Sequence, residues 1–202
     1  FAHSLRSILR HDPDVVLIGE IRDLETAENA VQASLTGHLV FSTLHTNDAS
    51  GAFARMTDMG VEPFLVASTL EAIMAQRLVR RLCPECKKRV TPDPKSFAPD
   101  FPVDRLIDGA LVESQGCRAC RHVGYNGRMG IYELLVNNEE IRDLAHNRAN
   151  TWEIKQAAVR FGMETLREDG WRKVIAGSTS AEEVMRVTKG DKLIASTNLR
   201  TG

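Results

Sequence analysis

The first half of the chain alternates short apolar runs with segments whose apolar residues recur at helical spacing. Residues 15–18 form a continuous β-rich apolar run, typical of a strand buried on both faces of a parallel sheet. A helix is expected next, with Asp23 as its N-cap and Gly37 ending it in a left-handed conformation. A second strand over 38–43 and a second helix from about 47 towards 60 follow. This order predicts an α/β fold with right-handed crossovers.

The pattern changes after residue 62. Pro63 is expected to open a third helix, followed by a short strand over 78–82. The residues that suggest helical spacing there are Phe64, Leu70, Ile73, Met74 and Arg77. Clustered prolines then predict an extended, turn-rich excursion as far as Cys120. They are Pro92, Pro94, Pro99 and Pro102.

The last third of the chain is expected to be mainly helical. A strand is predicted over 128–136, and capping-box patterns at Asn150–Glu153 and Ser180–Glu183 mark two later helix starts. The residues after 188 lose periodicity and predict a loose tail. The predicted segments are therefore a sheet-and-helix core over 1–82, the excursion over 83–124, a strand and helical subdomain over 125–188, and the tail over 189–202.

Composition describes an ordinary globular protein. The sequence has 43% hydrophobic residues, and its 26 Lys and Arg nearly balance 27 Asp and Glu, for a net charge of −1. This balance argues against binding to nucleic acid or anionic membranes through bulk charge. No apolar run approaches the roughly 20 residues of a spanning helix, and the N-terminus lacks a signal-peptide pattern. A cytoplasmic protein is expected, and the start without Met inside an amphipathic pattern suggests a fragment.

Two Cys-x-x-Cys pairs carry the strongest local signal. Cys83 and Cys86 form the first pair, Cys117 and Cys120 the second, and 30 residues separate the pairs. Two such knuckles can converge on one tetrahedral zinc, and a closed shell of four thiolates would make that zinc structural. Free thiols, redox motifs and an iron–sulfur cluster are the weaker alternatives.

Polar residues follow both predicted strands of the first half. Glu20, Arg22 and Asp23 come after the first strand, and His45 comes after the second. Ligands bind at the carboxyl ends of strands in open parallel sheets, so Glu20 and His45 are candidate catalytic residues if the strands pair. Surface charges beside a helix cap, and a hydrogen-bonded structural histidine, are the alternatives. His38 lies at the opposite end of the second strand and is the weaker candidate.

Several longer motifs carry a family resemblance. The segment Ile18–Asp23 resembles the atypical Walker B box of the secretion ATPases that power type II secretion and type IV pili, and 36–47 resembles their histidine box. Gly127–Leu134 and Glu182–Thr188 are similar to the family's carboxy-terminal signatures. The resemblance extends from residue 1 to 188. The cysteine excursion separates the chain from the pilus-retraction branch, and Asp58–Leu65 looks most like the type II secretion branch.

The resemblance implies a partial RecA-like P-loop ATPase core with a zinc-binding excursion and a C-terminal helical subdomain. It implies a cytoplasmic homo-hexamer, peripheral to the inner membrane, that uses ATP and Mg²⁺ and contacts secretion platform proteins. Glu20 would orient the attacking water or hold the Mg²⁺ shell, and His45 would sense the γ-phosphate. Nucleotide or subunit contacts are implied for Arg6, Arg10, Arg22, Asp23, His38 and Arg128. For Arg6 and Arg10 a solvated helix face is the alternative.

One departure from the family concerns phosphate binding. A P-loop needs Gly-x-x-x-x-Gly-Lys-Ser/Thr, and the sequence contains no Gly-Lys dipeptide. The family carries this loop upstream of its Walker B strand. We therefore expect the chain alone to bind ATP weakly or not at all and not to hydrolyse it.

Other functional classes remain as alternatives. Pilus extension is the alternative within the family. Basic residues around the knuckles suggest a nucleic-acid-binding zinc ribbon, whose affinity should fall steeply with salt. They are Arg77, Arg80, Arg81, Lys87, Lys88, Arg89, Arg118 and Arg121. A module that serves only protein interactions is the third possibility.

Overall fold

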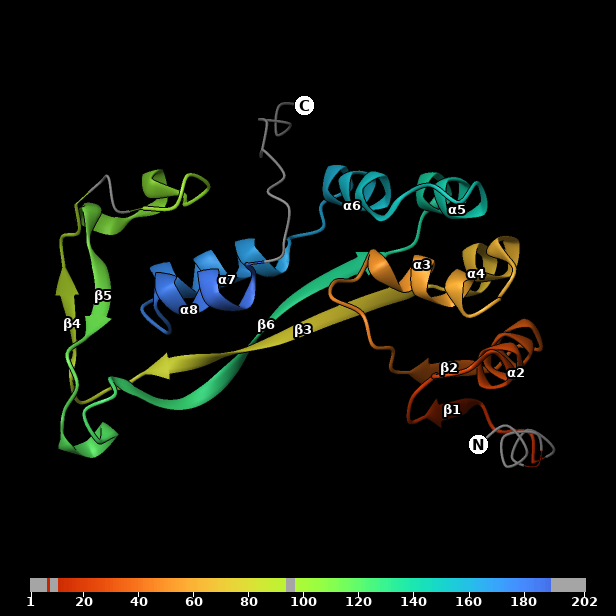
Figure 1. Ribbon diagram of the computed structural model, residues 1–202, viewed down its shortest axis with the longest axis horizontal. Coiled ribbons are helices and arrows are strands. Elements are labelled where there is room, and N and C mark those ends of the chain that lie inside the picture. Colours follow the sequence, from red (N-terminus) through yellow and green to blue (C-terminus); the bar gives the residue numbers. More distant parts are fainter. Residues whose placement is uncertain (1–6, 8–10, 94–96, 190–202) are drawn as a thin grey trace. The chain divides into compact units, whose positions relative to one another are not determined.

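The computed structural model describes residue 7, residues 11–93 and residues 97–189. Arg6, Arg10 and the tail beyond Lys189 lie outside these residues. The α-helices and β-strands of the described residues, in chain order, are β1 (Val15–Ile18), α2 (Leu24–Leu35), β2 (Leu39–Ser42), α3 (Gly51–Asp58), α4 (Pro63–Thr69), β3 (Ala72–Leu82), β4 (Lys87–Val90), β5 (Leu111–Ser114), β6 (Tyr125–Val136), α5 (Glu139–His146), α6 (Thr151–Arg160), α7 (Leu166–Ile175) and α8 (Ala181–Val187) (Figure 1).

The first strands and helix form as the sequence predicts. β1 and β2 are parallel neighbours, with Val15 opposite Leu39 in the register. The Asp23 side chain accepts a hydrogen bond from the backbone N–H of Thr26 at 2.9 Å and so caps α2. Gly37 has a φ of +95°, the left-handed conformation expected at the end of this helix. The parallel β–α–β order of the α/β prediction is therefore confirmed.

The expectation that β1 is buried on both faces is wrong. Val16 and Ile18 are buried, whereas Val15 and Leu17 keep 54% and 77% of their surface exposed. Side chains alternate across a strand, so the face of β1 that carries Val16 and Ile18 is buried and the opposite face is exposed. An unbroken apolar run does not reveal that only one face is covered.

The third helix is shorter than predicted, and the following strand is longer. α4 ends at Thr69, and Leu70 already has extended backbone angles. Ile73, Met74 and Arg77 lie on β3, which pairs with β6 from far along the chain. Figure 1 shows the two long strands running in opposite directions. This distant pairing overrides the local helical spacing, because short apolar runs fit either structure.

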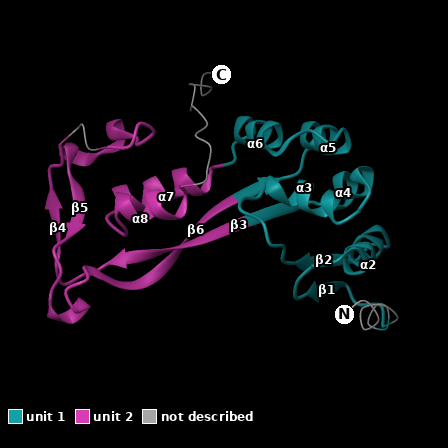
Figure 2. Ribbon diagram, viewed as in Figure 1, with its two compact units in different colours: residues 1–74, 134–163 teal, residues 75–133, 164–202 magenta. Residues whose placement is uncertain are grey.

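Two compact units divide the described chain (Figure 2). One contains residues 1–74 and 134–163, and the other contains 75–133 and 164–202. In the first unit, helices α4, α5 and α6 pack in sequence against one another, and α2 and α3 also contact α4. The buried Asn137 amide donates to the carbonyls of Ala67 and Leu70, at 3.0 and 2.5 Å, and so joins the end of β6 to the end of α4. The four sequence-based segments stay predictions.

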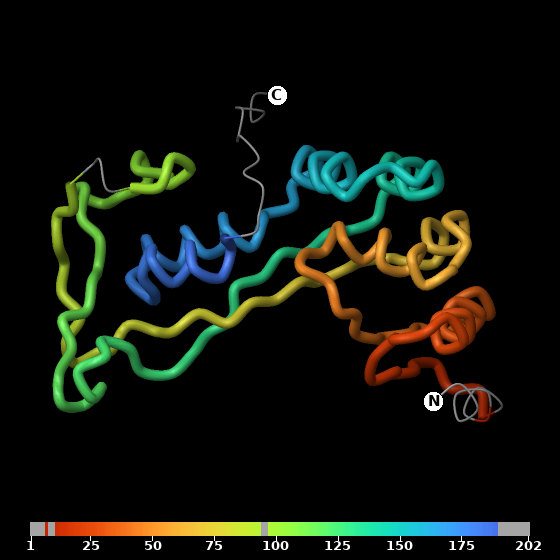
Figure 3. The backbone as a smooth tube through the Cα atoms, in the orientation of Figure 1, coloured from red at the N-terminus to blue at the C-terminus, as the bar shows by residue number. Residues whose placement is uncertain are grey.

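The second unit joins the cysteine excursion to the last two helices. The chain leaves β3, passes through the β4–β5 hairpin and returns along β6 (Figure 3). The β4–β5 pair is antiparallel, with Val90 opposite Leu111. A core of apolar residues from the excursion and from α7 and α8 holds these parts together. Its buried members are Phe101, Leu111, Trp171, Val174 and Val184.

The capping predictions for the late helices are confirmed in part. Asn150 and Glu153 form the complete capping box that opens α6. Ser180 caps α8 by accepting from the N–H of Glu183, but the Glu183 side chain binds arginines instead of returning to the cap. The sequence analysis missed a third box, in which Thr165 and Glu168 open α7.

Candidate functional site

Parallel pairing brings the two candidate catalytic residues together. Glu20 follows β1 and His45 follows β2, and the pairing continues beyond the strands. The Thr43 hydroxyl donates to the carbonyl of Gly19 at 2.8 Å, and the N–H of Ile21 donates to the carbonyl of Thr43 at 3.0 Å. As a result, Nε2 of His45 lies 3.2 Å from Oε2 of Glu20. An acid and an imidazole thus meet at the carboxyl edge of the sheet, where ligands bind in this fold class.

A cation keeps the Glu20 carboxylate charged. The hydrogen bond from Arg22, whose Nε lies 2.6 Å from Oε2, is the main cause that lowers the pKa of Glu20, and His45 adds to the effect. The Glu20 side chain is 30% exposed and the His45 side chain 78% exposed. An ionised, accessible carboxylate beside an accessible imidazole is suited to orienting water or a phosphate group.

The other sequence-predicted contacts are distributed more widely. Asp23 is engaged as the α2 cap, and this hydrogen bond from Thr26 lowers its pKa. His38 Nδ1 lies 3.1 Å from the Ala33 carbonyl oxygen, at the other end of α2. Arg128 is exposed on β6, in the second unit. The structure thus gives Asp23 and His38 local structural partners, and the nucleotide or subunit roles stay predictions.

The loop after His45 contains a residue that the sequence analysis missed. The Asp48 carboxylate accepts from the N–H of Gly51 at 3.0 Å and from the Ser50 hydroxyl at 3.2 Å. Its other oxygen accepts from Nζ of Lys155 at 3.2 Å, and the Lys155 side chain is only 5% exposed. An acidic residue just before a helix was a visible cap signal, whereas nothing near Lys155 in the sequence points to Asp48.

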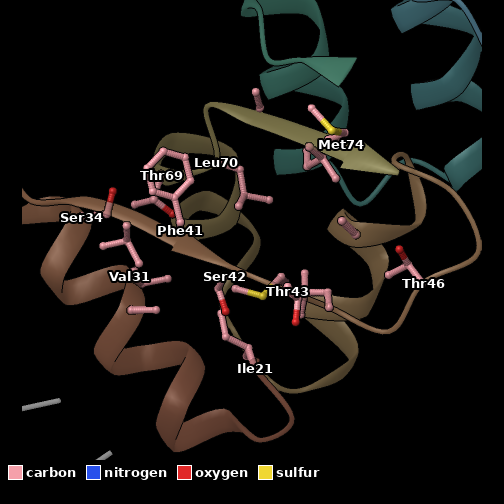
Figure 4. A pocket seen from close by; sticks show the side chains of 17 residues that line it. Ile21, Val31, Ser34, Phe41, Ser42, Thr43, Thr46, Thr69, Leu70 and Met74 are labelled. Carbon is pink, nitrogen blue, oxygen red and sulfur yellow. The ribbon is translucent and has the colours of Figure 1, made fainter. Parts of the chain in front are cut away.

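An apolar pocket lies next to this loop. It has a volume of about 280 Å³ and is lined by residues of α2, β2, α3, the end of α4 and the start of β3 (Figure 4). Thr43 and Thr46, which lie within two residues of His45 in the sequence, line the pocket, together with Val31, Leu70 and Met74. Neither Glu20 nor His45 lines it. The pocket therefore adjoins the acid–imidazole pair, through Ile21, Leu44 and Thr46, without including it.

The four cysteines converge in the second unit. All four Sγ atoms lie within 4.8 Å of one another. The Sγ atoms of Cys83 and Cys117 are 3.9 Å apart, those of Cys86 and Cys120 3.9 Å, and those of Cys117 and Cys120 3.8 Å. Zn–S bonds of about 2.3 Å in a tetrahedron put sulfur atoms roughly 3.8 Å apart. The predicted cluster is confirmed, and its dimensions fit a tetrahedral metal ion.

The thiols of this cluster have different environments. Burial raises the pKa of Cys83 to about 11. Backbone N–H groups of Cys117 and Gly124 approach the Cys120 sulfur at 3.1 and 3.3 Å, and these hydrogen bonds lower the pKa of Cys120 to about 6. Such N–H groups stabilise a thiolate, which is the form that binds a metal. The backbone around Cys120 therefore favours the form of this sulfur that binds a metal.

Comparison with known proteins shows which family the chain resembles. A family model described as "Type II/IV secretion system protein" matches residues 1–186. The type II secretion system ATPase E of Vibrio cholerae is 52% identical over 189 residues, which cover 94% of this chain and 37% of that protein. The type IV pilus assembly ATPase PilB of Myxococcus xanthus is 50% identical over 194 residues, covering 95% and 34%. The chain spans about a third of the length of these relatives.

A solved structure supports the same comparison. The pilus retraction motor PilT with bound ADP matches with a TM-score of 0.62 and 29% identity, covering 92% of this chain and 43% of that chain. This likeness confirms the predicted α/β class with part of an ATPase core. None of these relatives favours the nucleic-acid-binding alternative. Within the described residues, no helix is both long and apolar enough to cross a membrane.

Proposed function

Because the chain belongs to the type II/IV secretion system protein family, we propose that it is part of an ATPase motor that couples ATP hydrolysis to protein export by type II secretion. The observation that carries the proposal is the contact between Glu20 and His45, at 3.2 Å, at the carboxyl edge of a parallel sheet. The relative from Vibrio cholerae, named as a type II secretion ATPase, supports it.

Each side chain of the site has its own role in the proposed ATP hydrolysis. Bound ATP and Mg²⁺ supply the phosphoryl group and the neutralisation of its charge. Glu20, kept ionised by Arg22, orients the attacking water through its carboxylate. His45, held beside Glu20 and largely exposed, senses the γ-phosphate. Arg6, Arg10, Arg22 and Arg128, with Asp23 and His38, contribute nucleotide or subunit contacts.

The assembly and the metal complete the proposal. The motor is a homo-hexamer in the cytoplasm, peripheral to the inner membrane, and it contacts secretion platform proteins. Structural Zn²⁺, held by Cys83, Cys86, Cys117 and Cys120, ties the excursion together, because the sulfur spacing suits tetrahedral coordination. The names of the relatives, an ATPase and a motor, support the motor part of the proposal.

A type IV pilus assembly ATPase is the second candidate. The PilB proteins of Myxococcus xanthus and Thermus thermophilus are 50% and 49% identical to the chain, close to the identity of the type II secretion relatives. Both candidates use the same acid–imidazole site. They are distinguished by complementation of an export defect or of a pilus-assembly defect, respectively.

The 202-residue chain on its own is proposed to be inactive. Its sequence contains no Gly-Lys dipeptide and therefore no complete P-loop motif. Saturable micromolar binding of ATP by the chain, with magnesium-dependent release of phosphate, would overturn this part of the proposal.

The decisive experiment compares two carboxylates in the longest natural form of the protein. Glu20→Gln removes the ionised carboxylate with little change in shape and should lower kcat by about 10²–10⁴-fold. Glu28→Gln is the matched control, because Glu28 is an exposed carboxylate on α2. An unchanged rate in Glu20→Gln would show that the catalytic assignment is wrong even though the fold is right.

A further inference from the structure

The loop that carries His45 is anchored at both of its ends. On the N-terminal side, Thr43 is fixed by its hydrogen bonds to Gly19 and Ile21, which extend the sheet. On the C-terminal side, the Thr46 hydroxyl donates to the carbonyl of Asp48 at 2.9 Å. His45 lies between these anchors and is itself largely exposed. The position of its ring therefore depends on both anchors.

Asp48 organises the C-terminal anchor. One carboxylate oxygen accepts from the N–H of Gly51 and from the hydroxyl of Ser50, so Asp48 fixes the start of α3. The other oxygen accepts from Nζ of Lys155, which lies 107 residues away in the sequence, on α6. Both residues belong to the first compact unit. The carboxylate therefore connects the histidine loop to a helix from the last third of the chain.

Lys155 is an unusual residue for its position. Its side chain is 5% exposed, and its helical neighbours Ile154, Ala157 and Ala158 are also buried. A buried ammonium group is costly unless it is paired, and an apolar side chain of similar length would fill this space without needing a partner. The specific contribution of the charge is therefore its bond to Asp48, 3.2 Å away.

We propose that Lys155 is a positioning residue for ATP hydrolysis, which acts through Asp48 to hold the loop that presents His45 to Glu20. The proposal rests on the proposed function of Glu20 and His45. Lys155 itself does not touch the reacting groups. It keeps the Asp48 anchor, and with it the loop that carries His45, in place. This affects catalysis because a displaced His45 imidazole can no longer assist the Glu20 carboxylate.

The first test measures the His45–Glu20 contact without ATP. In the 202-residue chain, ring-nitrogen NMR signals of His45 are recorded with and without Glu20→Gln. The Glu20→Gln change should shift these signals in the wild-type background and should leave them almost unchanged in a Lys155→Met background. Lys155→Arg keeps a cation and should restore much of the response. A full response in folded Lys155→Met would overturn the proposal.

The second test measures catalysis in the longest natural form. Lys155→Met should lower kcat by about 10–100-fold while KM for ATP stays nearly constant, because positioning rather than substrate binding is lost. The matched control is Glu140→Gln with Arg160→Met, which breaks a more exposed ion pair between α5 and the same helix α6. This control should keep the wild-type kcat. An equal loss of kcat in both variants would show that Lys155 acts only through helix packing and would overturn the proposal.

Two further outcomes need their own measurements: a Lys155→Met variant that does not fold, and a wild-type protein that does not hydrolyse ATP. If Lys155→Met does not fold, the double variant Asp48→Asn with Lys155→Met removes the unpaired carboxylate as well and should fold with the His45 response lost. A wild-type response in that double variant would refute the proposal. If the wild-type protein hydrolyses no ATP, the proposed function fails, but the NMR response in the chain still decides whether Lys155 positions His45.

Discussion

Oε2 of Glu20 and Nε2 of His45 lie 3.2 Å apart although the residues are 25 positions apart in the sequence. The contact arises because two neighbouring parallel strands end at the same edge of the sheet. Arg22 is a third member of this group and binds the same carboxylate oxygen at 2.6 Å. The electrostatics of the site can therefore be tested one residue at a time.

The first prediction concerns the titration of Glu20. Its pKa lies below the ordinary value of 4.5, with the hydrogen bond from Arg22 as the leading cause. Arg22→Gln should therefore move the pKa back towards 4.5, and His45→Asn should move it less. Carboxyl ¹³C NMR over an acid titration measures both shifts. A larger effect of His45→Asn than of Arg22→Gln would contradict this ranking.

The second prediction concerns removal of the metal. Purified protein should contain about one zinc ion per chain, and a strong chelator should lower its thermal midpoint, because the metal bonds that link the two cysteine pairs are lost. Cys120→Ser should bind metal most weakly among the ligand variants, since two N–H groups already favour its thiolate. Metal analysis and thermal unfolding test this, and adding zinc back is the control. Freshly purified, unchelated protein without zinc would exclude the site.

The third prediction concerns acid stability of the second unit. Burial by itself raises the pKa of Glu183, but hydrogen bonds from Arg186 and Arg80 prevail and lower it to about 2. A carboxylate whose folded pKa is lowered stabilises the protein above its unfolded pKa, and that contribution is lost as pH falls from about 4.5 to about 2.

Glu183→Gln isolates this contribution. At neutral pH it should reduce the free energy of unfolding by about 2 kcal/mol, because charged hydrogen bonds are lost. It should also flatten the dependence of stability on pH in the acid range. The neighbouring Glu182 is exposed, so Glu182→Gln is the control and should change little. Denaturant unfolding at several pH values measures both effects, and parallel pH curves for wild type and Glu183→Gln would contradict the assignment.

The fourth prediction concerns the packing of α7 on α8. A Cβ atom at Gly170 would lie 2.5 Å from Cγ1 of Val184, which is fully buried. Gly170→Ala should therefore cost about 1–3 kcal/mol through overpacking, although alanine favours a helix. Adding Val184→Ala removes the clashing methyl groups. Urea unfolding should show a smaller combined loss than the sum of the two single changes, and strict additivity would count against the contact.

Family and site chemistry were accessible from the sequence because they depend on short contiguous motifs. The box that contains Glu20, the segment around His45 and the two cysteine pairs each occupy only a few consecutive residues. The family comparison confirms the resemblance, and the sulfur distances confirm the cysteine cluster. The Asp23 cap and the Asn150–Glu153 box were predictable for the same reason, since a cap involves neighbours within one helical turn.

Long-range pairing explains what the sequence analysis missed. The helical spacing around Ile73 was misleading because β3 pairs with a strand that follows some forty residues later. The Ser180 box is incomplete because the Glu183 carboxylate binds Arg80, a residue distant in the sequence, with 2.6 Å between Oε1 and the guanidinium nitrogen. Local patterns do not record such partners, and a strong distant contact outweighs a weak local preference.

The sequence by itself determined which groups are available: the Walker B-like box with Glu20, the histidine box with His45, and four thiols in the spacing of a metal site. Only the tertiary structure decided which of them meet. Parallel strands bring His45 to Glu20, and α6 brings Lys155 to Asp48. The physical reason is that a motif's chemistry resides in its own side chains, whereas the energy of a buried charge or a paired strand depends on neighbours that only the folded chain supplies.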